Sequence, residues 1–176
     1  MMTVSSAATV QTADGPFTVV ASSDAVLASG WTDDLWSLVE LIHTTLRPVT
    51  IEMNAVSPFL ARALAAVEDY YGDDLLAPCD IPVKQYAGPF HLKAWEALRA
   101  VKPGETVTYT ELAERAGNAS AVRAAGSACA FNAAALFVPC HRVVRADNTL
   151  GGYRYGLPVK QSLLIREQEW AAKQVA

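Results

Sequence analysis

The stretch AAALFVPCHRVV, residues 133–144, is the part of this sequence from which the rest is best understood. Its first half, Ala133–Val138, is a continuous apolar run, which is typical of a buried segment. The run leads directly into Cys140, which is followed at once by His141 and Arg142. A thiol, an imidazole and a guanidinium in succession are not a pattern expected from packing of an apolar core. We therefore interpret this stretch as a buried support that presents a reactive cysteine.

Cys140 is the candidate nucleophile. The reactivity of a thiol depends on its thiolate fraction, which a neighbouring base or positive charge raises. His141 can accept the thiol proton directly or through a water, and a carboxylate would then orient the imidazole, as in other Cys-His systems. Glu167, in a helix expected over Lys160–Trp170, is the first candidate for that carboxylate. The residues alone leave Glu169 open as the alternative.

Two short helices are expected before this stretch. Thr108 and Glu111 match a capping box, in which each side chain bonds the backbone N–H of the other residue. Gly117 suits a left-handed C-cap for the first helix. Ser120 is expected to cap the second helix, which runs from Ala121 to about Phe131. Two short helices joined by a tight glycine-containing turn form a helix-turn-helix.

The second of these helices is almost without bulky side chains. Arg123 is its one long charged group, and it lies near the N-terminus, where it opposes the helix dipole. A helix of small residues permits close approach to a large partner, although an alanine-rich core helix is the commoner structure. The small residues are Ala121, Ala124, Ala125, Gly126, Ser127, Ala128 and Ala130.

The rest of the chain predicts a small α+β unit followed by a helical one. We expect a disordered tail over residues 1–14, an N-terminal α+β domain over 15–85 and a C-terminal domain over 86–176. The further expected elements are a hairpin of Pro16–Ala21 and Ala25–Trp31, a helix from Asp33 or Asp34 to about His43, a strand Val49–Met53, a helix Ser57–Tyr71, a strand Asp80–Lys84 and a helix Phe90–Val101.

The net charge of −4 conceals a difference between the two halves of the chain. Residues 1–90 hold three basic against eleven acidic residues, a net of −8, and residues 91–176 hold eleven against seven, a net of +4. This asymmetry indicates an anionic partner for the second half, or a solubilising acidic first half.

The cysteines and the hydropathy exclude several classes of protein. Three cysteines without tight spacing argue against a disulfide framework and fit a reducing compartment. They also lack the paired ligand spacing of a structural zinc site, so we expect no metal. No apolar run is long enough to span a bilayer, and the N-terminus does not resemble a signal peptide, so a cytoplasmic protein is expected.

The hexapeptide PCHRVV at residues 139–144 resembles the active-site signature of the O6-alkylguanine-DNA alkyltransferases, also called methylated-DNA–protein-cysteine methyltransferases. The resemblance extends in order and spacing from about Gly88 to Glu167. Residues 152–156, GYRYG, are most similar to the C-terminal domain of the bacterial adaptive-response protein. Other matching positions are Phe90, Trp95, Tyr109, Arg123, Asn132 and Lys160.

The resemblance implies a role for each residue of the site. Cys140 is the alkyl acceptor, which His141 activates through a water while Glu167 orients the imidazole. Tyr109 crowds the 3′ phosphate of the target nucleotide and donates a proton as guanine leaves. Arg123 is the finger that replaces the extruded base. Further implied contacts are those of Thr110, Asn118 and Ala124 with DNA, of Asn132, Pro139 and Val143 with the active-site turn, and of Tyr153 and Arg154 in the loop that closes over the base.

The resemblance also implies a fold and a reaction. The fold is α+β, with an N-terminal ribonuclease H-like α/β domain and a C-terminal helical domain that carries a winged-helix-like helix-turn-helix. The reaction is direct reversal of O6-alkylguanine damage in duplex DNA after nucleotide flipping, with O4-alkylthymine as a weaker substrate. Each molecule, expected to be a monomer that needs no cofactor, is consumed in one transfer.

Two other functions use the same residues. An alkyltransferase-like protein flags lesions without transfer, but proteins of that kind lack the acceptor that Cys140 supplies here. A cysteine hydrolase would need an oxyanion hole and would turn over repeatedly. The chain also departs from the family pattern: Asn118-Ala119-Ser120 replaces a proline-containing turn, and the bulky Arg154-Tyr155 stands where many members have small residues, which bears on the alkyl size that fits.

Overall fold

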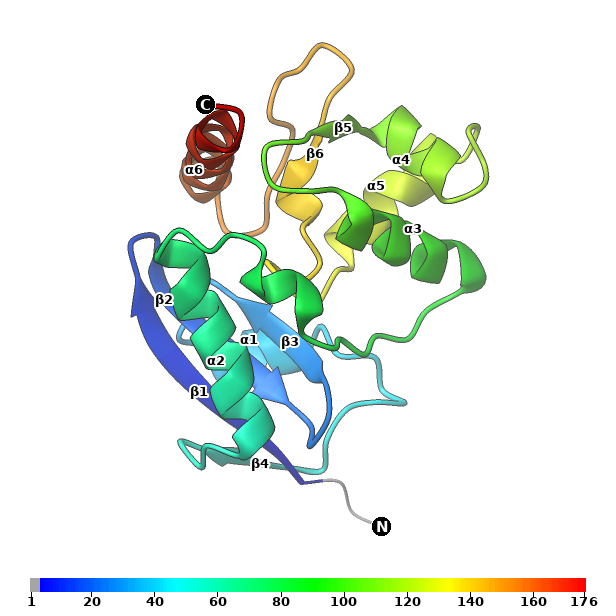
Figure 1. Ribbon diagram of the computed structural model, residues 1–176. Helices are drawn as coiled ribbons and strands as arrows, with labels where there is room; N and C mark the ends of the chain where they lie inside the picture. Colours follow the sequence, from blue (N-terminus) through cyan, green and yellow to red (C-terminus); the bar gives the residue numbers. More distant parts are fainter. Residues whose placement is uncertain (1–3) are drawn as a thin grey trace. The chain divides into compact units, whose positions relative to one another are not determined.

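The computed structural model describes residues 4–176, which form two compact units (Figure 1). Unit 1 comprises the chain up to Tyr86 together with Ala133–Phe137, and unit 2 comprises Ala87–Asn132 and Val138–Ala176. The mixed α+β class expected from the sequence is confirmed. The change of unit after Tyr86 lies one residue from the expected boundary, whereas the return of residues 133–137 to unit 1 was not foreseen.

Unit 1 is built on a four-stranded sheet of order β3-β2-β1-β4. The strands are β1 (Val4–Thr12), β2 (Gly15–Ala21), β3 (Val26–Gly30) and β4 (Thr50–Met53). The pairs β1–β2 and β2–β3 are antiparallel, and β4 runs parallel to β1. The predicted hairpin and fourth strand are therefore present.

The prediction that residues 1–14 form a disordered tail is wrong for the part of them that the structure describes. Residues 4–12 form β1, in the centre of the sheet, and Ala7 is fully buried. The small residues of this segment suit a strand that is packed on both faces. A search for strands by alternating bulky apolar residues does not detect such a segment. The part of the tail at residues 1–3 lies outside the described residues.

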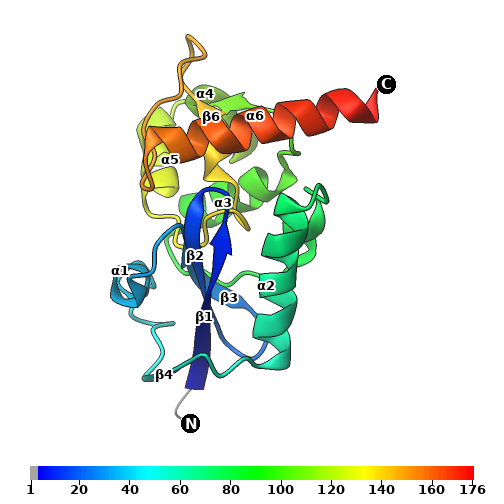
Figure 2. The same cartoon turned by 90° about the vertical axis from the view of Figure 1, so that its left-hand side faces the viewer.

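Two helices cover opposite faces of this sheet, as Figure 2 shows. Helix α2 (Pro58–Tyr71) packs on β1 and β2, and α1 (Leu35–Val39) packs on β2 and β3. Ser57 and Asp34 accept hydrogen bonds from the first turns of α2 and α1. Helix α1 is shorter than the predicted span to His43.

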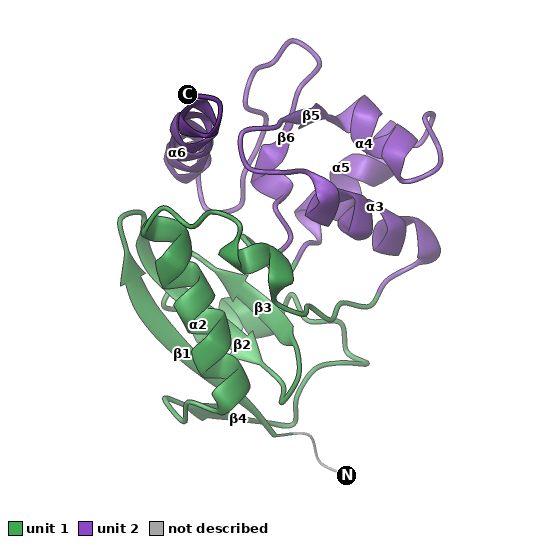
Figure 3. Ribbon diagram, in the orientation of Figure 1, with its two compact units in different colours: residues 1–86, 133–137 green, residues 87–132, 138–176 purple. Residues whose placement is uncertain are grey.

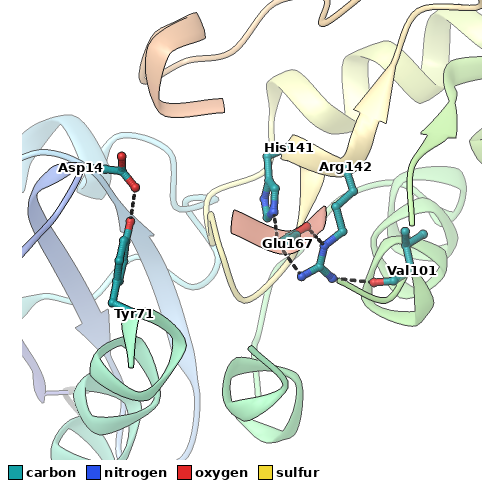
Figure 4. Close-up of polar contacts among 6 residues, drawn as sticks. All are labelled: Asp14, Tyr71, Val101, His141, Arg142 and Glu167. Carbon is teal, nitrogen blue, oxygen red and sulfur yellow. Dashed lines mark hydrogen bonds and ion pairs between the residues drawn. The ribbon is translucent and has the colours of Figure 1, made fainter. Parts of the chain in front are cut away.

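A part-buried polar contact connects the turn between β1 and β2 to α2 (Figure 4). The Tyr71 hydroxyl donates to Asp14 Oδ2 at 2.7 Å and accepts from Trp31 Nε1 at 2.9 Å. Burial raises the pKa of Tyr71 far above its ordinary value, so the hydroxyl remains a donor. Farther along, residues 77–80 form a 3₁₀ turn and Val83 a single bridge with Val26, in place of the predicted strand Asp80–Lys84.

The apolar segment Ala133–Phe137 belongs to unit 1, as the colours of Figure 3 show. Ser29 of β3 donates from its N–H to the Ala133 carbonyl at 2.8 Å and from its hydroxyl to the Ala135 carbonyl at 2.8 Å. The Ala133 N–H in turn donates to Gln85 Oε1 at 2.9 Å. Every residue of the segment is buried, so its prediction as a buried run is confirmed.

Unit 2 is mainly helical. Its helices are α3 (Pro89–Ala100), α4 (Tyr109–Arg115), α5 (Val122–Ala130) and α6 (Leu157–Gln174). Helices α3, α4 and α5 pack on one another, and Trp95 Nε1 of α3 donates to the Ala128 carbonyl of α5 at 2.9 Å. The predicted capping box of α4 is confirmed, and Gly117 has the predicted left-handed φ of +96°.

Two details of unit 2 correct the sequence expectations. The short strands β5 (Val107–Thr108) and β6 (Val143–Val144) pair in parallel, so the unit is not purely helical. Ser120 does not cap α5; its hydroxyl and N–H both donate to Asn118 Oδ1 within the turn. The turn satisfies its own polar groups, which leaves α5 without a side-chain cap.

Gly104 brings α6 close to the segment that precedes β5. Its φ is +87°, and a Cβ at this position would overlap the Cβ of Ala171 in α6. A glycine is therefore required here for both reasons. None of the helices formed within residues 4–176 has the length and apolarity needed to cross a bilayer.

Candidate active site

Cys140 opens a 3₁₀ turn, Cys140–Arg142, that leads directly into β6. The turn is fixed at both ends. The Cys140 N–H donates to the Val138 carbonyl at 2.9 Å, and the Arg142 N–H donates to the Pro139 carbonyl at 3.1 Å. Because β6 pairs with β5 and β5 leads into α4, the turn is also held in register with Tyr109, the first residue of α4.

Asn132 connects the end of α5 to the Cys140 turn. Its Nδ2 donates to the Val138 carbonyl at 2.8 Å and to Cys140 Sγ at 3.2 Å. The bond to the Val138 carbonyl is buried, whereas the bond to Sγ is part-buried at a cavity wall. An N–H directed at sulfur favours the thiolate over the thiol.

His141, Glu167 and Arg142 form a buried cluster behind the Cys140 turn (Figure 4). Glu167 of α6 accepts from His141 Nε2 at 2.7 Å through Oε1. It also accepts from Arg142 twice, from Nε and from Nη2, each at 2.9 Å. Arg142 Nη1 donates to the Val101 carbonyl at 2.6 Å. The structure thus brings Glu167, and not the exposed Glu169, to the imidazole.

The charges of this cluster follow from burial and pairing. Burial alone would raise the pKa of Glu167, but the His141 and Arg142 contacts outweigh it and hold the pKa at about 2. Burial lowers the pKa of His141, and Glu167 offsets this only in part. At neutral pH the cluster therefore contains a carboxylate and a neutral imidazole.

The carboxylate selects one tautomer of His141. Because Glu167 is ionised, the Nε2 atom that bonds it must carry the proton, and Nδ1 is left with a lone pair. Nδ1 is buried and has no hydrogen-bond partner among residues 4–176. The imidazole is thus arranged to accept a proton at Nδ1.

The Cys140 thiol is not ionised by its surroundings alone. Burial raises its pKa above the ordinary value, although the Asn132 hydrogen bond and the charge of Lys160 act in the opposite direction. The guanidinium of the neighbouring Arg142 is engaged by Glu167 and by the Val101 carbonyl.

Cys140 lies on the wall of a cavity of about 520 Å³ within unit 2. Four of the predicted site residues share this cavity with it, namely Tyr109, Asn132, Tyr153 and Arg154. Pro139 and Val143 are buried beside it, as supports of the turn rather than as lining. The remaining lining residues are Gly126, Cys129, Ala130 and Gly152.

Sequence reasoning overlooked the contribution of α5 to this wall. Gly126, Cys129 and Ala130 recur at the spacing that places side chains on one helix face, so periodicity within the alanine-rich helix was the available signal. Burial raises the pKa of Cys129 far above its ordinary value, which makes it a neutral second thiol in the cavity.

Tyr109 and the loop after β6 approach one another closely. A Cβ on Gly151, whose φ is +71°, would lie 3.2 Å from the Tyr109 hydroxyl. Burial raises the pKa of Tyr109, so the hydroxyl keeps its proton at neutral pH and can donate it.

Lys160 of α6 binds the same loop through its side-chain ammonium group. Its Nζ donates to the carbonyl of Val143 at 2.7 Å, to that of Leu150, and to that of Gly152 at 3.4 Å. The side chain is buried, and burial lowers its pKa. Sequence reasoning noted Lys160 only as a matching position, because its carbonyl partners lie 8 to 17 residues away.

The residues expected to meet DNA are exposed or half-buried on α4, α5 and the turn between them. Arg123 is exposed at the second position of α5 and makes no hydrogen bond or ion pair with another described residue. Thr110 and Asn118 are exposed, and Ala124 is half-buried. In the described chain no three His, Cys, Asp or Glu side chains gather in a way that could hold a metal ion.

Comparison with known proteins gives the same family by sequence and by structure. The family described as "6-O-methylguanine DNA methyltransferase, DNA binding domain" matches residues 89–169. The bifunctional transcriptional activator/DNA repair enzyme Ada of Escherichia coli is 49% identical over 92 residues, which are 52% of this chain and 26% of that protein. Mycobacterium tuberculosis OGT, solved in complex with DNA, is 25% identical with a TM-score of 0.76, and 94% of each chain is covered.

The chain spans only part of several relatives, for example 26% of the Escherichia coli protein and 38% of the regulatory protein ada of Salmonella typhimurium. It covers far more of the probable methylated-DNA–protein-cysteine methyltransferase of Acanthamoeba polyphaga mimivirus. There the identity is 37% over 121 residues, which are 68% of this chain and 78% of that protein. The resemblance read from the sequence is thereby confirmed, and the chain belongs to the methylated-DNA–protein-cysteine methyltransferase family.

Proposed function

We propose that this chain repairs duplex DNA by moving an alkyl group from O6 of guanine to the sulfur of Cys140, once per molecule. One observation carries the proposal. Cys140 lies on a cavity wall with the Asn132 amide on its sulfur, and the adjacent His141 is fixed by the buried carboxylate of Glu167. Membership of the family supports the same reaction.

The first step is removal of the Cys140 proton. We propose that His141 accepts it at Nδ1 through an intervening water, because Nε2 is already bonded to Glu167. The positive charge that develops on the imidazole is stabilised by that carboxylate. Since burial raises the pKa of Cys140, the thiol stays neutral until this base acts.

The second step is displacement at carbon. The bond between Cys140 Sγ and the alkyl carbon forms as the bond between that carbon and O6 breaks, and the guanine leaves with the electron pair. Tyr109 is the proposed donor of the proton that the guanine takes up, since its hydroxyl is protonated and lines the cavity. The product is a thioether, which water does not hydrolyse at useful rates, so each molecule acts once.

The target nucleotide must leave the base stack, at a cost of a few kcal/mol. We propose that Arg123 enters the duplex in its place, since it is exposed and has no partner in the described chain. The small residues of α5, among them Ala124, suit the minor groove, which is only about 6 Å wide. Thr110 and Asn118 are the proposed phosphate contacts, and the functional form is a monomer.

The finer fold assignment is part of the same proposal. The order β3-β2-β1-β4, with β4 parallel to β1 and helices on both faces, supports a ribonuclease H-like unit 1. The helix pair α4–α5 beside the small β5–β6 sheet supports a winged-helix-like unit 2.

Mass spectrometry after incubation with duplex containing O6-methylguanine tests the reaction. We expect a mass gain of one methylene, located on the Cys140 peptide and not on that of Cys129, with at most one equivalent transferred. The Cys140→Ala variant should bind the duplex and gain no mass, whereas Cys79→Ala, which alters a thiol of unit 1, should gain it as the original chain does.

Other results would identify the alternatives. Tight binding without a mass gain would favour a lesion-flagging protein. Repeated turnover, with the protein mass unchanged at the end, would favour a cysteine hydrolase. A gain on another peptide, or retained transfer by Cys140→Ala, would show that Cys140 is not the acceptor.

A further inference from the structure

Arg154 places a positive charge on the wall of the Cys140 cavity. It lies in a short loop bounded by two glycines of positive φ, Gly151 at +71° and Gly156 at +98°. From this loop Arg154 Nη2 donates to the carbonyl of Ala130, the last residue of α5, at 2.5 Å. Arg154 and Ala130 both line the cavity, so this hydrogen bond joins two parts of its wall.

No carboxylate offsets this charge at the cavity wall. Among the described residues that line it, Arg154 is the single side chain ionised at neutral pH, and the others are aromatic, small, amide or thiol residues. The charge of Lys160 also acts on Cys140. The ionised carboxylate of Glu167 does not line the cavity and is paired with Arg142. The cavity therefore presents a positive potential to whatever enters it.

The guanidinium of Arg154 has capacity for a further partner. It carries five N–H donors, and the bond to Ala130 is the one it makes with described residues. The Ala130 carbonyl carries only the partial charge of a helix C-terminus. A carboxylate offers a full charge and two oxygens that match the guanidinium fork, so it would pair more strongly.

We propose that Arg154 makes O6-alkyl groups that carry a carboxylate, such as carboxymethyl, a preferred substrate class of this chain. The inference rests on the proposed function, because the cavity must first receive the alkylated guanine. The carboxylate pairs with Arg154 while the methylene carbon meets Cys140. The Sγ–carbon bond forms as the carbon–O6 bond breaks, which leaves S-carboxymethylcysteine on the protein and a guanine that takes up one proton.

Three duplexes of the same sequence test the inference, carrying O6-carboxymethylguanine, O6-carbamoylmethylguanine or O6-methylguanine. The carbamoylmethyl group is nearly isosteric with carboxymethyl and has no charge. In single-turnover reactions followed by protein mass, we measure the ratio of the carboxymethyl rate to the carbamoylmethyl rate, and we expect pairing with Arg154 to raise this ratio at least about tenfold. This ratio should fall as salt is added, because the pairing lies at a partly exposed site.

Variants of two arginines identify the group responsible. Arg154→Gln should lower the carboxymethyl-to-carbamoylmethyl ratio at least about tenfold from its value in the unaltered chain, and Arg154→Lys should lower it less, because lysine keeps the charge without the fork. Arg145→Gln removes an exposed arginine of the same unit that does not line the cavity, and should keep the full ratio. A ratio cancels any general loss of activity.

The inference is overturned if the ratio of the unaltered chain survives in Arg154→Gln. A uniform loss on all three duplexes would also overturn it, since Arg154 would then serve DNA binding or the loop. Methyl transfer together with a ratio that does not depend on Arg154 overturns this inference alone, whereas the absence of transfer from every duplex contradicts the proposed function.

Discussion

Glu167 accepts hydrogen bonds from two different side chains, and the geometry of the candidate site depends on it. His141 bonds one oxygen, and Arg142 bonds both. Bringing these charges out of water is costly, so the cluster is stable only while each member keeps its partners. Arg142 does not reach Cys140, and we infer that it acts as a positioning residue that holds the carboxylate against the imidazole.

Replacing Arg142 by leucine should therefore be strongly destabilising. The change leaves the buried Glu167 carboxylate with His141 alone and removes a donor from the Val101 carbonyl. We expect the free energy of unfolding in urea to fall by about 3–5 kcal/mol. Arg115→Leu is the matched control, because its ion pair with Glu105 is exposed and should contribute less than about 1 kcal/mol. Similar losses in the two variants would contradict this role.

The same cluster should shape the acid stability of the protein. The pKa of Glu167 is about 2 in the folded chain, below its ordinary 4.5, so the unfolded chain takes up a proton first as the pH falls. The stability this group contributes is complete above pH 4.5 and is lost as the pH falls from 4.5 toward 2, by on the order of 2–3 kcal/mol. The lowered pKa of His141 causes an earlier loss, which begins below about pH 6.5.

Urea unfolding between pH 7 and pH 2.5 measures this dependence. In Glu167→Gln the loss between pH 4.5 and pH 2.5 should become shallower, because the amide does not titrate. A variant whose acid limb has the same slope as that of the unaltered chain would show that Glu167 is not the group responsible.

At the scale of elements, the contact between Gly104 and α6 sets the position of Glu167. Helix α6 carries Glu167 and, one turn later, Ala171, whose Cβ occupies the space that a side chain at position 104 would need. The Glu167 carbonyl would also lie only 3.3 Å from such a Cβ. Displacement of this helix should therefore move the carboxylate away from His141.

Gly104→Ala should lower both stability and the rate of alkyl transfer. Strain at φ +87° and overlap with Ala171 together should cost about 1–3 kcal/mol in urea unfolding. The double variant Gly104→Ala, Ala171→Gly should recover the part due to overlap but not the part due to φ. Gly88→Ala is the control, because its φ is −63° and its surroundings are open. No recovery in the double variant would argue against overlap.

Elements governed by local chemistry were predictable from the sequence, and those governed by distant partners were not. The Thr108–Glu111 capping box and the Gly117 turn involve neighbours in the chain, and both are present. Strand β1 depends on pairing with β2 and β4, which the small residues of 4–12 do not indicate. The Ser120 hydroxyl donates to Asn118 Oδ1 and does not cap α5. The general preference of serine for the N-cap position does not predict this competing hydrogen bond.

The candidate site divides in the same way. Cys140 and His141 were found from their own motif, and Glu167 was preferred over Glu169 through the family resemblance. The two hydrogen bonds from Arg142 to Glu167 join residues that are 25 positions apart, and no local sequence pattern predicts them. The cavity wall formed by α5 was hidden because small residues in a helix serve packing as often as binding.

At the scale of the whole molecule, the charge difference follows the two units. Residues 87–90 and 133–137 carry no charge, so unit 1 has the net −8 and unit 2 the net +4 of the two sequence halves. The anionic partner indicated by the sequence would therefore meet unit 2, which also contains the candidate site. Attraction to DNA phosphates by such a unit is electrostatic and largely independent of sequence.

Affinity for undamaged duplex should consequently fall steeply with salt. In fluorescence anisotropy, the logarithm of the association constant should decrease linearly with the logarithm of salt concentration. Arg123→Gln should reduce the slope by about 1 if its charge faces the duplex. Arg47→Gln, in unit 1, should leave the slope unchanged. Equal slopes for Arg123→Gln and the unaltered chain would show that the charge of Arg123 lies away from the duplex.

Because residues 133–137 belong to unit 1, they affect any attempt to express the half that contains the candidate site by itself. A fragment starting at residue 87 would carry a hydrophobic pentapeptide without the Ser29 backbone and hydroxyl that it bonds in the complete chain. Such a fragment should aggregate through this exposed stretch. The hydrogen bond from Asn132 to the Val138 carbonyl holds the two residues that flank this segment together. A short polar linker between Asn132 and Val138 could therefore replace residues 133–137 in such a fragment.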